Sequence, residues 1–129
     1  MSVSGLVERI PYARLIGMRA ERDDEGLLCR LPFKEAIVGN ARLPAVHGGV
    51  VGAFLEMTAI LALIDEGDAE RVPKPINFSV DYLRSAGPHE TLGRAEIVKL
   101  GRRIANVRVL AYQGDAAKPV AAGIGNFRL

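Results

Sequence analysis

A chain of 129 residues is long enough for one domain with a single hydrophobic core, and no linker, repeat or low-complexity segment divides it. Hydrophobic residues make up 49% of the sequence and charged residues 25%, as in an ordinary globular protein. A net charge of +2 without a long basic run argues against a nucleic-acid-binding protein, and a single cysteine, Cys29, excludes an intrachain disulfide.

The N-terminal segment does not resemble a secretion signal. Glu8 and Arg9 interrupt the region in which a signal peptide has a continuous apolar run. A single cysteine is typical of a reducing compartment. These features predict a cytoplasmic protein that forms one domain over residues 1–129 and has no membrane segment.

The first quarter of the chain is predicted to form a short helix followed by a β-hairpin. Ser4 is a candidate N-cap for the helix, which is expected to end at Pro11. Polar and apolar residues then alternate through residues 14–33, which predicts a hairpin with its turn at residues 24–26. Cys29 falls in the return strand, where we expect it to be a packing residue.

After a predicted loop over residues 34–45, the chain contains a long apolar stretch. From Gly48 to Ile64 the only charged residue is Glu56. The length of the stretch and its Leu, Ala and Met content favour a helix over a strand. A helix that is apolar on all sides must be buried on all sides, so the rest of the domain is expected to surround it.

The remaining sequence alternates with a period of two and is predicted to form an antiparallel meander. With the N-terminal hairpin, it gives an α+β fold in which a curved antiparallel sheet of about six strands is wrapped around the apolar helix. The expected strands of the meander cover residues 76–82, 92–100, 104–113 and 120–129.

This order of elements is similar to the hotdog fold. The run His47-Gly48-Gly49, with Glu56 nine residues after the histidine, resembles the motif of the phenylacetate-degradation-type (PaaI-like) acyl-CoA thioesterases within that fold. The resemblance covers nearly the whole chain. Weaker matches flank the motif at Leu15-Ile16-Gly17-Met18, Asp81-Tyr82-Leu83-Arg84 and Gly101-Arg102-Arg103.

The resemblance implies catalytic roles for four residues. Glu56 would be the nucleophile or general base that acts on a thioester carbonyl, and the backbone N–H of Gly48 would polarise that carbonyl. The free N–H groups and the dipole of a helix start suit this second role. His47 and an upstream amide, here Asn40, would help to place the thioester and its leaving group.

Two departures from the family pattern bear on these roles. Asn40 lies one residue further from His47 than the usual spacing, and Ile60 stands where the family often has a hydroxyl, one turn after the acid. A supporting hydroxyl must therefore come from Thr58 or Ser79, or be absent.

A coenzyme A thioester also needs contacts for its phosphates and an apolar site for its acyl group. We expect no metal ion, because no His, Cys or carboxylate pair has ligand spacing, and no cofactor beyond the coenzyme A of the substrate. Phe54, Met57, Phe78 and Tyr82 are the expected acyl-site residues. The residues expected to bind coenzyme A are Tyr82, Leu83, Arg84, Gly101, Arg102 and Arg103.

Helix geometry predicts a homodimer independently of the resemblance. Nine residues at about 100° each place Glu56 on the opposite side of the helix from His47 and about 13 Å along it. A general base must come within hydrogen-bond reach of its target or of one water, and within one chain Glu56 cannot easily reach the Gly48 amide. Two antiparallel helices related by a two-fold axis can bring Glu56 of one chain to the Gly48 amide of the other. Whether such dimers pair into tetramers is left open. The small residues expected to allow their close approach are Gly52, Ala53 and Ala59.

The leading hypothesis is hydrolysis of an acyl-CoA thioester to a free acid and coenzyme A, with the choice between aryl and aliphatic acyl groups open. A hotdog enoyl-CoA hydratase or dehydratase is one alternative, because it also uses a histidine and an acid. A non-catalytic acyl-CoA-binding module is the other alternative, favoured by the absence of a hydroxyl at Ile60.

Overall fold

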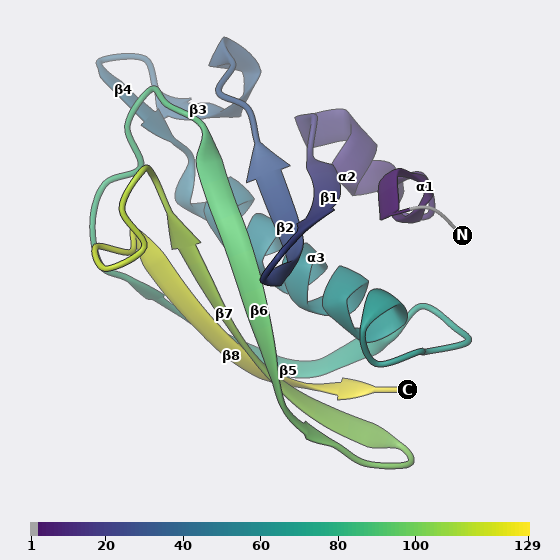
Figure 1. The fold of residues 1–129 in the computed structure, drawn as a ribbon. Helices are drawn as coiled ribbons and strands as arrows, with labels where there is room; N and C mark the ends of the chain where they lie inside the picture. Colours follow the sequence, from purple (N-terminus) through teal and green to yellow (C-terminus); the bar gives the residue numbers. More distant parts are fainter. Residues whose placement is uncertain (1–2) are drawn as a thin grey trace.

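The long apolar stretch forms the helix α3 (Gly48–Asp65) in the computed structural model, which describes residues 3–129. Figure 1 shows α3 lying across the concave face of a curved sheet. By length and composition α3 is apolar enough to cross a membrane, but 61% of it is buried inside the domain. Most of the helix from Phe54 onward is therefore buried, as the sequence predicted. Gly48–Val50, Gly52 and Ala53 are not buried, so the prediction of burial on all sides is wrong at the N-terminal end.

The sheet has six antiparallel strands in the order β1-β2-β6-β7-β8-β5, which confirms the α+β hotdog architecture. The predicted meander is correct for β6, β7 and β8 but wrong for β5, which pairs with β8 at the sheet edge. Residues 83–90 connect β5 to β6 across the end of the sheet. Eight residues can span about 26 Å, and the three strand spacings between β5 and β6 amount to only about 14 Å. The strands are β1 (Arg19–Asp23), β2 (Gly26–Leu31), β5 (Lys74–Tyr82), β6 (Thr91–Leu100), β7 (Ile104–Tyr112) and β8 (Ala121–Arg128).

The N-terminal segment forms two short helices, α1 (Val3–Val7) and α2 (Pro11–Ile16). The prediction that Pro11 ends a helix is wrong, because Pro11 begins α2. Proline suits the first helical position, where its φ is already helical and no N–H is needed. Gly17, with φ of 80°, ends α2, so the hairpin begins later than predicted.

The segment predicted as loop before α3 folds into a projecting arm, shown at the top of Figure 1. The arm comprises the 3-10 helix η1 (Glu35–Ile37) and a hairpin of β3 (Val38–Asn40) and β4 (Leu43–Val46). The N–H of Val46 donates to the Ala86 carbonyl at 2.8 Å and fixes the base of the arm. The glycine and proline in these short strands concealed them from prediction.

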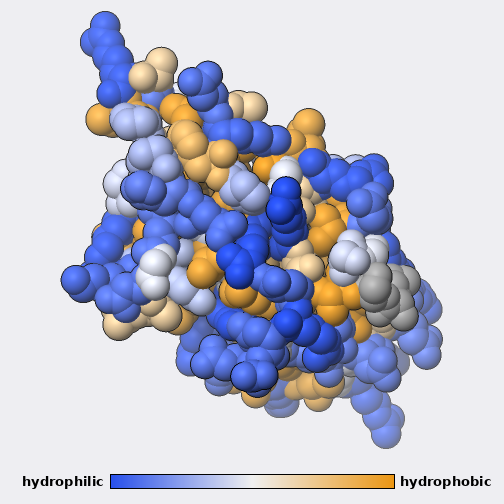
Figure 2. All heavy atoms as spheres, turned by 45° about the horizontal axis from the view of Figure 1, so that its top comes forward, coloured by the Kyte–Doolittle hydropathy of each residue, from blue (hydrophilic) through white to orange (hydrophobic). Residues whose placement is uncertain are grey.

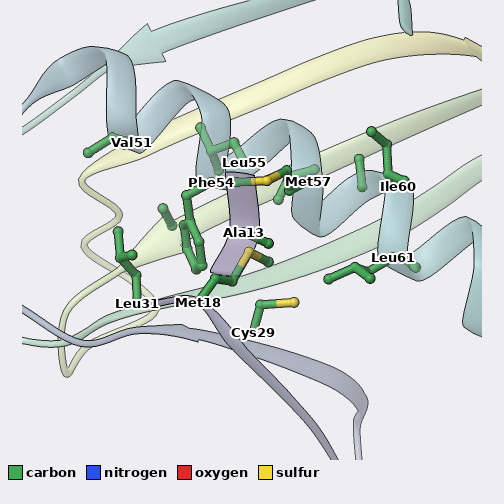
Figure 3. Packing of buried hydrophobic residues seen from close by; sticks show 14 of the residues in the cluster. Ala13, Met18, Cys29, Leu31, Val51, Phe54, Leu55, Met57, Ile60 and Leu61 are labelled. Atoms are coloured by element: carbon green, nitrogen blue, oxygen red, sulfur yellow. The ribbon is translucent and has the colours of Figure 1, made fainter. Parts of the chain in front are cut away.

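The core lies between α3, β2 and the central strands. Figure 3 shows Phe54 and Leu61 directed from α3 toward β2, where Leu31 and Cys29 lie. Gly93 on β6 leaves room for the Phe54 ring, since a Cβ there would lie 2.9 Å from Cε2. Phe54, expected in the acyl site, is instead a fully buried core residue.

Two further expectations concern the interior. Cys29 is a packing residue, as predicted, and its burial raises the pKa of the thiol to about 12. Met57 is also a core residue and does not line an acyl site in this protomer. On the outside, polar side chains dominate the face shown in Figure 2, with apolar residues in separate patches between them.

Candidate functional site

The N-terminus of α3 is built around the side chain of His47. His47 is the N-cap, and its Nδ1 accepts a hydrogen bond of 2.9 Å from the Gly49 N–H. The imidazole fits closely between two glycines. A Cβ at Gly39 would lie 2.9 Å from its Cδ2, and a Cβ at Gly49 would lie 3.0 Å from its Nδ1. The arm and the helix start therefore hold the ring in one position.

Gly48 is the first residue of α3, so its N–H has no carbonyl one turn earlier in the helix. Among residues 3–129, no group accepts a hydrogen bond from this N–H. The Val50 and Val51 N–H groups donate to the His47 carbonyl instead. The helix dipole adds positive potential here, so Gly48 offers an amide suited to an oxyanion.

Tyr82, at the end of β5, contacts this helix start. Its hydroxyl donates to the Gly48 carbonyl at 2.7 Å. Its ring covers Gly48 and Gly52, where added Cβ atoms would lie 3.5 Å and 3.1 Å from Tyr82 atoms. Sequence reasoning placed Tyr82 on the substrate but missed this bond, since no local signal joins residues 34 positions apart.

A cavity of about 410 Å³ opens beside Gly48. Tyr82, Leu83 and Arg84 line it, so the structure brings these predicted binding residues to the helix start. The Arg84 guanidinium donates to the Pro119 carbonyl at 2.9 Å and is thereby held at the cavity. The remaining lining residues are Val46, Val51, Ser85, Ala86 and Val120.

The other predicted binding residues, Gly101, Arg102 and Arg103, lie at the opposite end of the sheet, in the β6–β7 turn. The register pairs β5 with β8 from Lys74 near that turn to Tyr82 near the cavity. Eight strand steps separate these ends by about 26 Å. One protomer therefore does not bring the 101–103 turn to its own Gly48.

Glu56 lies in the middle of α3 with a partly exposed side chain. Its carboxylate has neither a hydrogen-bond partner nor an ion-pair partner within the described part of the chain, residues 3–129. Because α3 is unbroken from Gly48 to Asp65, eight residues separate Glu56 from Gly48 by about 12 Å. The two groups of one chain are therefore apart, as the helical spacing predicted.

Asn40 lies at the exposed turn of the arm. Its Oδ1 accepts the Arg42 N–H at 3.0 Å and closes the β3–β4 turn. In this hairpin Asn40 pairs with Leu43, whereas Val38 pairs with Val46 next to His47. The structure therefore brings Gly39, and not the Asn40 side chain, against the imidazole.

Neither candidate hydroxyl supports Glu56 in this protomer. Thr58 is fully buried and donates to the Phe54 carbonyl at 2.8 Å. Ser79 alternates with Phe78 and Val80, which pack toward the core, and so faces the outer side of the sheet. Of the three options the sequence left open, an absent hydroxyl fits the structure best.

The small residues of α3 do not all face outward as expected. Ala59 is fully buried in the core, so its assignment to a helix–helix contact is wrong. Gly52 accommodates Tyr82 and Val80 of its own chain. Ala53 remains partly exposed, one turn from Glu56. Within residues 3–129, no three His, Cys, Asp or Glu side chains are grouped to hold a metal ion.

Comparison with known proteins gives a consistent result. The family described as the thioesterase superfamily matches residues 43–120. The Escherichia coli K12 medium/long-chain acyl-CoA thioesterase YigI is 26% identical over 118 residues, covering 80% of this chain and 76% of YigI.

Two solved structures extend the similarity over almost the whole chain. A Chromobacterium violaceum protein has a TM-score of 0.79 and 36% identity, covering 98% of this chain and 88% of its own. A phenylacetic acid degradation-related protein of Ralstonia eutropha has a TM-score of 0.80 and 21% identity, covering 100% of both chains. These matches agree with the PaaI-like resemblance of the sequence motif.

Proposed function

The chain belongs to the thioesterase superfamily, and from this premise we propose that it hydrolyses acyl-CoA thioesters to a free acid and coenzyme A. The observation that carries this proposal is the unoccupied Gly48 N–H, which lies beside a cavity at the start of α3. Glu56 supplies the second group, a carboxylate in an apolar helix without a partner in residues 3–129.

The proposed reaction uses water as the nucleophile. Glu56 accepts a proton from the water while the water oxygen attacks the thioester carbonyl carbon, and the Gly48 N–H stabilises the oxyanion that forms. The intermediate collapses, the carbon–sulfur bond breaks, and coenzyme A leaves as a thiolate that needs no strong acid. Direct attack by the Glu56 carboxylate, followed by hydrolysis of the anhydride, gives the same products.

The distance between Gly48 and Glu56 requires a second subunit in this mechanism. We propose a homodimer in which Gly48 of one protomer faces Glu56 of the partner subunit across antiparallel α3 helices. A two-fold axis through this arrangement passes near Gly52, the midpoint between the two residues. Gly52 lies beside Val80 near the middle of β5, so the same axis can pair the two β5 edges.

The β5 edge supports this assembly. β5 has nine residues, and among residues 3–129 it pairs with β8 alone. Ile76 on this strand is 53% exposed. Long apolar edge strands are usually covered, because their free N–H and C=O groups and apolar side chains promote association. A second β5 paired along this edge would bond the free N–H and C=O groups and cover the apolar side chains.

The dimer also explains the separation of the predicted coenzyme A contacts. Antiparallel β5 strands would bring the 101–103 turn of the partner subunit toward the end of the sheet that holds Tyr82 and Arg84. Arg84 and the partner's Arg102 and Arg103 would then be cations for the phosphates of one substrate. Asn40 closes the turn of the arm with its carboxamide, and this proposal gives it no direct part in the reaction.

Glu56→Gln tests the proposal. We expect the rate of thioester hydrolysis to fall at least about a hundredfold, because the general base is lost, while acyl-CoA binding persists. Glu70→Gln, at an exposed acid beyond the helix, is the matched control and should keep full activity. Medium- and long-chain acyl-CoA esters should be assayed first, since YigI has that description, followed by phenylacetyl-CoA.

The presence of Ile60 in place of a hydroxyl one turn after Glu56 favours one second candidate, a module that binds acyl-CoA without turnover. Tight acyl-CoA binding by the unmutated protein with no hydrolysis of any ester in the panel would establish that reading. Hydration of crotonyl-CoA would instead indicate a hydratase. The proposal includes no cofactor beyond the coenzyme A of the substrate, and a cytoplasmic location stays a prediction.

A further inference from the structure

One peptide group at the start of α3 is held from both sides. Its carbonyl oxygen, on Gly48, accepts the Tyr82 hydroxyl at 2.7 Å. Its N–H, on Gly49, donates to Nδ1 of His47 at 2.9 Å. The phenol and the imidazole are therefore linked through a single amide, although β5 and the helix start are far apart in sequence.

This link determines where the imidazole carries its proton. Nδ1 accepts a backbone N–H and cannot itself be protonated in this arrangement, so the neutral ring carries hydrogen on Nε2. No group in residues 3–129 accepts a hydrogen bond from that Nε2. A hydrogen bond to an amide oxygen strengthens the donor on the same amide through polarisation. The Tyr82 hydroxyl therefore reinforces the bond that selects this tautomer.

The surroundings are shaped for this link. Gly48 and Gly52, four residues apart, leave the space that the Tyr82 ring and hydroxyl occupy. Gly39 and Gly49 leave the space for the imidazole. A Cβ at Gly39, Gly49 or Gly52 would meet His47 or Tyr82 at 3.1 Å or less, so these three glycines leave the space that the two rings need.

We propose that Tyr82 is a positioning residue that holds His47 in its Nε2–H tautomer and thereby presents one fixed donor to the substrate. This inference rests on the proposed thioester hydrolysis and adds to it a role for the Nε2–H of His47 as a hydrogen-bond donor to the thioester or the departing sulfur. Tyr82 itself touches Gly48 and acts through the histidine. The Gly48 N–H, which belongs to the preceding peptide, stays available for the carbonyl oxygen.

The tautomer can be measured without substrate. The chain has only two histidines, so long-range ¹H–¹⁵N correlations above pH 8 distinguish His47 from His89, which serves as an internal control. We expect a protonated Nε2 and a bare Nδ1 at His47 in the unmutated protein. Tyr82→Phe should give a mixture of tautomers at His47 and no change at His89. An unchanged single tautomer at His47 would overturn the proposal.

Kinetics of the same variant test the consequence for hydrolysis. Tyr82→Phe retains the ring and loses one hydrogen bond, so kcat should fall about tenfold while KM changes less than about twofold. Tyr12→Phe removes a hydroxyl from an exposed tyrosine on α2 and should leave both constants unchanged. An unchanged kcat in Tyr82→Phe contradicts the positioning role.

Gly52→Ala provides an independent route if Tyr82→Phe folds poorly. Its new Cβ would lie 3.1 Å from the Tyr82 hydroxyl oxygen, which must shift by a few tenths of an ångström and weaken its bond to Gly48. This variant should therefore change the tautomer ratio and kcat in the same direction as Tyr82→Phe, by a smaller amount. In the Tyr82→Phe background that oxygen is absent, and Gly52→Ala should have no further effect. Additive losses in the double variant would contradict the proposal. If the unmutated protein hydrolyses no thioester, the proposed function fails, and the tautomer measurement still decides the role of Tyr82.

Discussion

At the scale of single residues, the position of Gly48 allows its N–H to be tested separately from its backbone conformation. Gly48 is the first residue of α3 and is not among the glycines with positive φ. Proline is favoured at this position, where its ring carbon Cδ takes the place of the N–H hydrogen. The preceding His47 has ψ of 133°, which a following proline permits.

We therefore predict that Gly48→Pro folds normally and loses about a hundredfold or more in kcat, because the oxyanion donor is gone. Gly48→Ala is the control, since it keeps the N–H and its Cβ would contact Tyr82 at 3.5 Å, an ordinary packing distance. Activity in Gly48→Pro close to that of Gly48→Ala would exclude this N–H from the reaction. Circular dichroism and thermal unfolding check that both variants are folded.

Residue-scale prediction from sequence succeeded where the signal was local. The placement of His47 and Gly48 at a helix start, with Glu56 along the same helix, is confirmed, whereas their catalytic roles stay predictions. The role of Asn40 in closing a turn was not predicted, because the arm was read as loop. The hydrogen bond from the Tyr82 hydroxyl to the Gly48 carbonyl could not be predicted from the sequence, because it depends on how β5 packs against α3.

At the scale of elements, the β1–β2 hairpin is tied to the centre of the sheet by an ion pair. Arg94 on β6 donates to the Asp23 carboxylate at 2.8 Å and also to the Leu27 carbonyl at 3.1 Å. The Arg94 guanidinium lowers the pKa of Asp23, with a smaller contribution from the Glu25 N–H. The ionised form of Asp23 is therefore favoured in the folded protein.

This shift predicts how stability changes with pH. Because the pKa of Asp23 is lower in the folded than in the unfolded chain, its contribution is present above about pH 4 and is lost as pH falls through the folded pKa. Asp23→Asn should be less stable than the unmutated protein at pH 7, and the difference should shrink toward pH 3. Urea unfolding at both pH values measures it. Asp24→Asn, at the neighbouring turn, should give no such pH-dependent difference.

Prediction of elements succeeded for composition and period but not for pairing. The helix α3 was predicted from the length of the apolar stretch and its Leu, Ala and Met content. The position of β5 beside β8 was not, since alternation identifies a strand without naming its neighbours. Pro11 was misread because proline both ends and begins helices, and only the following residues decide which.

At the scale of the whole molecule, the spacing of the motif along one rigid helix is the main constraint. A continuous α3 keeps Gly48 and Glu56 of one chain about 12 Å apart, whatever the rest of the fold does. The proposed reaction uses both groups, and we therefore propose that they come from different chains. This proposed composite site can be tested without knowing the assembly's structure.

Mixing two inactive variants provides that test. Gly48→Pro chains keep Glu56, and Glu56→Gln chains keep the Gly48 N–H, so a heterodimer of the two has one intact site and one doubly damaged site. Refolded together in equal amounts, half of the dimers should be mixed, and activity should recover to about a quarter of the unmutated level. Each variant refolded alone should stay inactive. No recovery on mixing, with mixed dimers demonstrated by mass spectrometry, would mean that each site is built within a single chain.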